Sequence, residues 1–157
     1  ADFESAPGRL HRRRVGTLTV FDDAYNANPA SMRAALDALA DHSGPGRRVL
    51  VLGDMLELGA RSLPCHVELG RWAAELDPDL TVLVGRFTEA TAATMIGRGV
   101  DAGKVLHAGD AETAAQALPA LLREDDTVLL KASRALRFEI IRDAVQACCE
   151  SETAVQA

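Results

Sequence analysis

Residues 18–41 read LTVFDDAYNANPASMRAALDALAD, and this stretch contains a complete strand, turn and helix. Leu18 to Phe21 form a short apolar run typical of a buried strand, and the apolar residues after Ala30 recur at helical spacing. The polar octapeptide 22–29 lies between them. In an open α/β sheet, the crevice beyond the carboxyl ends of the strands is where ligands bind. The stretch therefore predicts both the fold class and the place to look for function.

The same strand-then-helix order recurs along the rest of the chain. It predicts a doubly wound, Rossmann-like α/β sheet of five parallel strands with helices on both faces. The segment 9–14, followed by a turn at Val15-Gly16, predicts an additional antiparallel edge strand. The parallel strands are expected at 18–21, 49–52, 81–84, 104–107 and 127–130, and the helices at 31–41, 64–76, 88–96, 111–123 and 137–149.

Composition narrows the class of protein. The chain has 157 residues, a size typical of one domain, and 48% of them are apolar. The net charge of −6 argues against a nucleic-acid partner, and no apolar run reaches the roughly 18 residues of a membrane span. Three cysteines without a favourable pairing fit reduced thiols in the cytoplasm. We expect a linker at 1–8, one domain at 9–150 and a loose tail at 151–157.

The octapeptide 22–29 holds the first group of candidate site residues. The side chains of Asn26 and Asn28 can each donate and accept hydrogen bonds, which suits a purine edge or ribose hydroxyls. Asp23 and Tyr25 are further candidates in the same turn. The alternative is that the Asp and Asn residues only build a turn before Pro29.

The second expected strand, 49–52, carries candidates at both ends. Arg48 precedes it and could balance the charge of a nucleotide, or could simply be exposed at the start of the strand. Asp54 follows the strand, where a ligand would lie, although a turn-capping role is equally consistent. His66 is expected in the first turn of the next helix, where it could contact a base or be an ordinary helix-start histidine.

The last expected strand is followed by Lys131, Ser133 and Arg134, which together form a cationic, hydrogen-bonding loop suited to a carboxylate. A solvated basic loop is the alternative. The chain contains neither Gly-x-x-x-x-Gly-Lys-Ser/Thr nor Gly-x-Gly-x-x-Gly, the two common phosphate-binding patterns. Cys or His pairs with zinc-ligand spacing are absent as well, so we expect no metal ligands in this chain.

Four segments resemble one family in order and spacing. They are Asp-Asp-Ala-Tyr-Asn-Ala-Asn-Pro-Ala-Ser-Met at 22–32, Gly-Asp-Met-Leu-Glu-Leu-Gly at 53–59, Cys-His-Val-Glu-Leu-Gly at 65–70 and Leu-Leu-Lys-Ala-Ser-Arg at 129–134. The chain resembles the C-terminal domain of the Mur ligases, specifically the UDP-N-acetylmuramoyl-tripeptide–D-alanyl-D-alanine ligases. The resemblance runs from about residue 9 to residue 145.

The resemblance implies a three-domain enzyme that uses ATP and Mg²⁺ to form an acyl phosphate on UDP-N-acetylmuramoyl-tripeptide. D-alanyl-D-alanine then attacks that acyl phosphate, and the C-terminal domain closes over a central ATPase domain of the same polypeptide. By this resemblance, Asn26, Asn28, Arg48 and His66 face the nucleotide. Lys131, Ser133 and Arg134 hold the dipeptide or the closed interface, and no catalytic residue lies in this chain.

Two departures from the family pattern bear on these expectations. The family usually has glycines where this chain has Ala132 and Ala135, and alanine disfavours positive φ angles. The absent phosphate-binding loop indicates a fragment that does not catalyse ligation alone. Two alternatives stay open: another amino-acid-adding ligase of the superfamily, or a flavodoxin-like receiver module using Asp22, Asp23, Asp54 and Lys131.

Overall fold

A computed structural model describes residues 10–23 and 26–156 of the chain, and the side chains of 10–23 and 26–151. These residues form a six-stranded sheet with the order β1-β2-β6-β3-β4-β5. The strands are β1 (His11–Val15), β2 (Leu18–Asp23), β3 (Arg48–Gly53), β4 (Leu80–Val84), β5 (Val105–Ala108) and β6 (Thr127–Lys131). The helices are α1 (Pro29–Asp41), α2 (Ser62–Glu75), α3 (Thr88–Gly97), α4 (Ala111–Leu121) and α5 (Glu139–Gln156), with short 3₁₀ turns η1 (Gly59–Arg61), η2 (Ala102–Lys104) and η3 (Arg134–Leu136).

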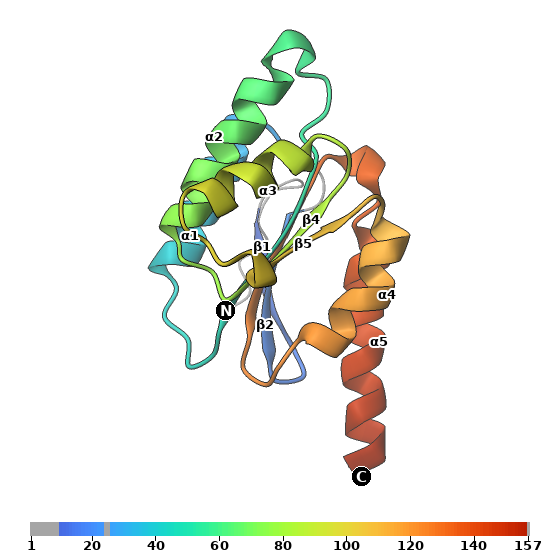
Figure 1. Ribbon diagram of the computed structural model, residues 1–157. Coiled ribbons are helices and arrows are strands. Elements are labelled where there is room, and N and C mark those ends of the chain that lie inside the picture. The colour runs from blue at the N-terminus through green and yellow to red at the C-terminus, as the bar shows by residue number, and fades with distance from the viewer. Residues whose placement is uncertain (1–9, 24–25, 157) are drawn as a thin grey trace.

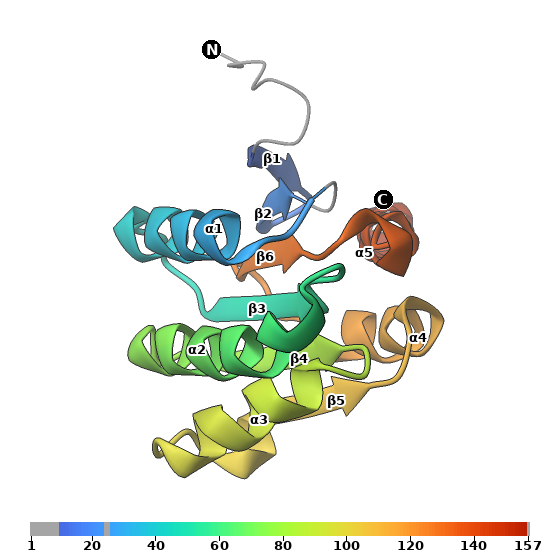
Figure 2. The same cartoon turned by 90° about the horizontal axis from the view of Figure 1, so that it is seen from above.

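The expected topology is confirmed. β2, β6, β3, β4 and β5 are parallel, and β1 pairs antiparallel with β2 at the edge of the sheet. The sheet lies between two helical layers, with α1, α2 and α3 on one face and α4 and α5 on the other (Figure 1; Figure 2). Strands buried on both faces explain why the sequence shows continuous apolar runs rather than alternation.

Each face of the sheet contributes alternate side chains to one of two cores. Leu50, Leu52, Leu83 and Leu129 pack under α1, α2 and α3. The residues next to them on the strands point to the other face, where they pack against Phe138, Ile141 and Val145 of the last helical segment. These strand residues are Val49, Val51, Val82, Val84, Val128 and Leu130. This two-sided burial fixes the register of every strand, because a slip of one residue would exchange the two cores.

The last helix differs most from its expected bounds. The expected helix at 137–149 begins at Glu139 and continues to Gln156, so residues 151–156 are helical rather than a loose tail. In Figure 1 the end of α5 extends beyond the body of the domain. The expected linker at 1–8 lies outside the described residues.

Candidate functional site

The carboxyl ends of the parallel strands form one edge of the sheet, which we call the carboxyl edge. It is the upper edge in Figure 1. β6 lies between β2 and β3, but its loop leads to α5 on one face of the sheet, whereas the loops after β2 and β3 lead to α1 and α2 on the other. Loops that diverge in this way open a crevice between them. The three loops that carry most of the predicted site residues meet at this crevice.

A buried ion pair joins two of these loops. Asp23 and Lys131 are partners in the parallel register of β2 and β6, and Lys131 Nζ donates to Asp23 Oδ2 at 2.5 Å and to the Asn26 carbonyl at 3.1 Å. The Lys131 side chain is fully buried and Asp23 is 7% exposed. Burial lowers the pKa of Lys131, while the bond to Asp23 acts in the opposite direction. The ammonium group thus fastens the polar turn after β2 to the end of β6.

The ion pair changes the interpretation of Lys131. The sequence predicts that Lys131 binds an incoming carboxylate, but its bonded carboxylate in the structure belongs to Asp23. The second oxygen of that group, Oδ1, is buried and accepts no hydrogen bond within the described part of the chain. A buried acceptor without a donor is costly, so this edge retains unused bonding capacity.

The amides of the polar turn have different roles. Asn28 is the N-cap of α1: its Oδ1 accepts from the Ser31 amide at 2.8 Å, and Ser31 Oγ accepts from the Asn28 amide at 3.1 Å. This reciprocal pair is a capping box, so the side-chain oxygen of Asn28 already accepts a hydrogen bond from the first turn of α1. The side chain of Asn26 is exposed at the crevice. Tyr25 lies outside the described residues.

Asp54 is a structural residue rather than a ligand in this conformation. Its carboxylate accepts the backbone N–H groups of Arg86, Phe87 and Thr88 at 2.9–3.0 Å, which caps the positive end of α3. Burial raises the pKa of Asp54, and the three amide bonds oppose that rise. A Cβ at Gly85 would lie 2.3 Å from this carboxylate, so the cap requires glycine there. With both oxygens bonded, Asp54 is a poor match to the phosphorylated aspartate of a receiver.

His66 likewise holds the loop instead of facing a base. Its ring is fully buried, Nδ1 lies 2.7 Å from the Ser62 carbonyl, and Nε2 lies 3.1 Å from the Met55 amide. Because an amide N–H can only donate, Nε2 is the acceptor and the proton is on Nδ1. Both ring nitrogens are therefore occupied. In this structure the histidine fixes the loop that follows β3, and its contact with a nucleotide stays a prediction.

Ser133 connects the loop after β6 to the loop after β3. Its Oγ accepts from the Leu56 amide at 2.9 Å, and its own amide donates to the Asp54 carbonyl at 3.2 Å. We call this pair of bonds the Ser133 clasp. The hydroxyl hydrogen takes no part in the clasp and can still be donated to a ligand. Arg134, the next residue, is exposed at the crevice.

The alanines that replace the family's usual glycines fit without strain. Neither Ala132 nor Ala135 has a positive φ, and the left-handed residue of this segment is Arg137, with φ 58°. Ala132 is buried against β3, where a Cβ placed on Gly53 would lie only 2.6 Å from the Cβ of Ala132. Glycine at position 53 therefore provides the space that alanine at position 132 fills.

Arg48 does not lie at the carboxyl edge with the other predicted site residues. It begins β3 and so lies at the opposite edge of the sheet, the amino edge. Its backbone amide donates to Asp79 Oδ2 at 2.9 Å and its guanidinium to the Ala40 carbonyl at 3.1 Å. The structure thus separates Arg48 from the residues at the carboxyl edge by the length of the strand, and its contact with a nucleotide stays a prediction.

Glu57 is a crevice residue that the sequence interpretation missed. It is exposed on the loop between β3 and α2 and has a left-handed backbone conformation, with φ 63°. The glycines at 53 and 59 flank it in the sequence and mark a tight turn, which was the available signal.

Two general features complete the description. Within residues 10–23 and 26–156, no group of three or more His, Cys, Asp or Glu side chains is arranged to hold a metal ion. No helix in that part of the chain is long and apolar enough to cross a membrane.

The parallel sheet with helices on both faces defines a Rossmann-like α/β domain. Residues 8–134 match the family model described as Mur ligase, glutamate ligase domain. The chain therefore belongs to the Mur ligase C-terminal domain family.

Relatives of known activity resemble the chain over most of its length. The UDP-N-acetylmuramoyl-tripeptide–D-alanyl-D-alanine ligase of Escherichia coli is 38% identical over 149 residues, which cover 93% of this chain and 31% of that enzyme. The enzyme of the same name from Bacillus subtilis is 35% identical over 82% of this chain and 28% of its own length. The chain thus spans about a third of the length of these relatives.

Solved structures agree with the sequence comparison. MurF from Acinetobacter baumannii superposes with a TM-score of 0.79 at 33% identity, covering 92% of this chain and 31% of that one. MurF ligase from Thermotoga maritima, determined in complex with ADP, superposes with a TM-score of 0.76 at 29% identity, covering 96% of this chain and 33% of that one.

Proposed function

We propose that this chain is the C-terminal domain of an ATP-dependent ligase that joins D-alanyl-D-alanine to UDP-N-acetylmuramoyl-tripeptide in cytoplasmic peptidoglycan precursor synthesis. One observation carries the proposal. Relatives with this named activity match the chain at 35–38% identity over 82–93% of its length. The Escherichia coli match covers nearly the whole chain, so the similarity is not confined to one motif.

In this proposal the loop after β2 meets the nucleotide. The exposed amide of Asn26 can bond to a purine edge or to ribose hydroxyls, and the amide nitrogen of Asn28 is not used by the capping box. Asp23 and Lys131 fasten this loop to β6 and so keep the two amides in place. Tyr25 stays a predicted contact of the same loop.

The loop after β6 receives the dipeptide. The Arg134 guanidinium and the Ser133 hydroxyl are suited to the terminal carboxylate of D-alanyl-D-alanine. The chain has no phosphate-binding loop, so the phosphates and Mg²⁺ would be held by the central ATPase domain of the same polypeptide. ATP supplies the phosphoryl group that activates the tripeptide carboxylate, and this domain orients the amine that attacks it.

The proposal is tested by measuring phosphate release from ATP with the tripeptide and dipeptide present. We expect ligation and phosphate release from the full-length polypeptide and none from the 157-residue chain. Phosphate release by the chain alone would contradict this division of labour. Ligation of a single amino acid in preference to D-alanyl-D-alanine would identify a different ligase of the superfamily and overturn the proposal.

A further inference from the structure

An exposed acidic side chain lies in the loop after β3, in a backbone conformation that glycine adopts most easily. Glu57 has φ 63°, in the left-handed region where a Cβ meets steric resistance. Nothing in the turn requires a side chain there, since glycine would fit at no steric cost. A carboxylate kept at such a position is a candidate for a role in binding.

The backbone on both sides of Glu57 is fixed. On one side, the Met55 amide donates to buried His66, and the Leu56 amide donates to Ser133 Oγ. On the other side, the Arg61 amide donates to the Leu58 carbonyl at 3.1 Å as the chain enters η1. Because the turn is held at both ends, the carboxylate is presented from a defined position at the edge of the crevice.

A cation is presented from the adjoining loop. The Ser133 clasp joins Leu56 to Ser133 at 2.9 Å, and the exposed Glu57 and Arg134 are the next residues after the two clasped ones. The crevice therefore has an anion and a cation on two loops that are bonded to each other. A free dipeptide has the matching charges, with its ammonium and carboxylate about 7 Å apart when extended.

We propose that Glu57 binds the ammonium group of the incoming dipeptide, while Arg134 binds its carboxylate. This inference rests on the proposed function and adds a specificity residue to it. The contact selects acceptors with a free amino terminus, because an acylated amine carries no charge and offers the carboxylate a weaker hydrogen bond.

The experiment uses the full-length polypeptide with Glu57→Gln and Glu57→Gly. Removing one charged hydrogen-bond partner is expected to raise KM for D-alanyl-D-alanine about tenfold. KM for ATP is expected to stay unchanged. N-acetyl-D-alanyl-D-alanine, used as a competitive inhibitor, lacks the ammonium, so its inhibition constant is expected to be the same in both variants and the parent. Glu68→Gln, which removes an exposed acid of α2, is the matched control and should change neither constant.

The two substitutions distinguish the effect of losing the Glu57 carboxylate from the effect of changing the conformation of the turn. Glycine suits the left-handed conformation, so Glu57→Gly should fold at least as stably as the parent and still show the higher KM. Normal ligation with an unchanged dipeptide KM would overturn the role of Glu57 and leave the proposed function intact. An equal loss of affinity for the acetylated inhibitor would also overturn it, by showing an effect of loop shape. Absence of ligation in the parent would overturn the proposed function and this inference together.

Discussion

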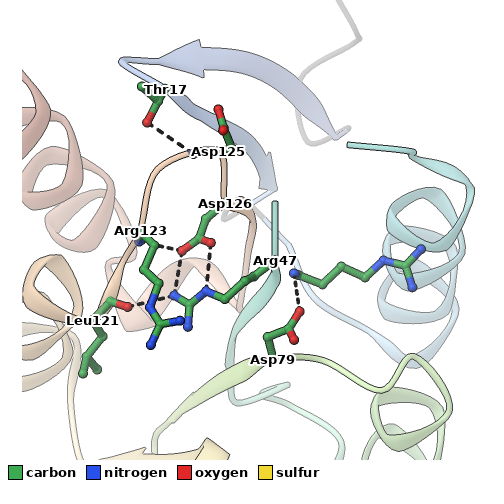
Figure 3. A network of polar contacts seen from close by, with 8 residues as sticks. Thr17, Arg47, Asp79, Leu121, Arg123, Asp125 and Asp126 are labelled. Carbon is green, nitrogen blue, oxygen red and sulfur yellow. Dashed lines mark hydrogen bonds and ion pairs between the residues drawn. The ribbon is translucent and has the colours of Figure 1, made fainter. Parts of the chain in front are cut away.

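An ion pair lies at each end of strand β6: Asp126 with Arg47 just before the strand, and Lys131 with Asp23 at its last residue. The two pairs differ in how many hydrogen bonds their carboxylates accept. At the amino edge, the carboxylate of Asp126 accepts Nε and Nη2 of Arg47 at 3.0 and 2.8 Å and the Arg123 amide at 2.8 Å (Figure 3). At the carboxyl edge, Asp23 accepts Lys131 on one oxygen, and the other has no donor within the described residues.

Within the described residues, the carboxylate of the amino-edge pair has donors on both oxygens, whereas the carboxylate of the carboxyl-edge pair has a donor on one. The pair at the amino edge is complete within the domain, since Arg47 also donates to the Leu121 carbonyl at 2.9 Å. Its hydrogen bond to Asp126 raises the pKa of Arg47 and keeps the pair charged. The pair at the carboxyl edge positions a loop, and one oxygen of Asp23 accepts no hydrogen bond from residues 10–23 and 26–156. Groups that a domain leaves unsatisfied are the ones that a ligand can complete.

The largest predicted effect is at the amino edge. Asp126→Ala removes a fully buried carboxylate and leaves the Arg47 guanidinium and the Arg123 amide without their acceptor. We expect a loss of about 3 kcal/mol in the free energy of unfolding, measured by urea denaturation. Asp37→Ala, which removes an exposed acid paired with Arg33, is the control and should cost less than about 0.5 kcal/mol. Similar losses in both variants would refute the comparison.

A smaller stability effect is expected at the carboxyl edge. Lys131→Met leaves Asp23 buried without its cation, and we expect a loss of about 2 kcal/mol, smaller than at the amino edge because fewer hydrogen bonds are lost. The double variant Asp23→Asn with Lys131→Met removes both charges and should be more stable than Lys131→Met alone. In the full-length polypeptide, Lys131→Met should also raise KM for ATP, since the loop with Asn26 is released. An unchanged KM would show that the pair has no positioning role.

The smallest effect concerns pH at the amino edge. Burial, followed by the nearby charges of Arg12 and Arg48, lowers the pKa of His42 from its usual 6.5. Below pH 6.5 the unfolded chain therefore binds a proton that the folded chain does not, and the folded state loses stability as the pH falls through this window. His42→Gln should remove that part of the pH dependence. Titration of the His42 ring by NMR should show a higher pKa in Arg48→Gln, and no change there would contradict the assigned cause.

The sequence alone predicts the fold well because strand burial and helix spacing are local properties. All five parallel strands and the antiparallel edge strand are found within one or two residues of their expected places. The largest difference is at the end of α5. The expected helix stops at residue 149, but α5 continues to Gln156.

Individual site residues are harder to predict, because their roles depend on partners far away in the sequence. Asp54 caps a helix 32–34 residues further on, and Lys131 pairs with Asp23 across 108 residues. A polar residue at a strand end shows where a site lies, but not whether a ligand or the protein itself is its partner.

The most direct test compares two arginines, one at each edge, in the full-length polypeptide. We expect Arg134→Gln, at the carboxyl edge, to lower kcat/KM for D-alanyl-D-alanine about tenfold. Arg48→Gln, at the amino edge, should leave the same constant within about twofold. A loss in Arg48→Gln equal to or greater than that in Arg134→Gln would contradict the assignment of binding to the carboxyl edge.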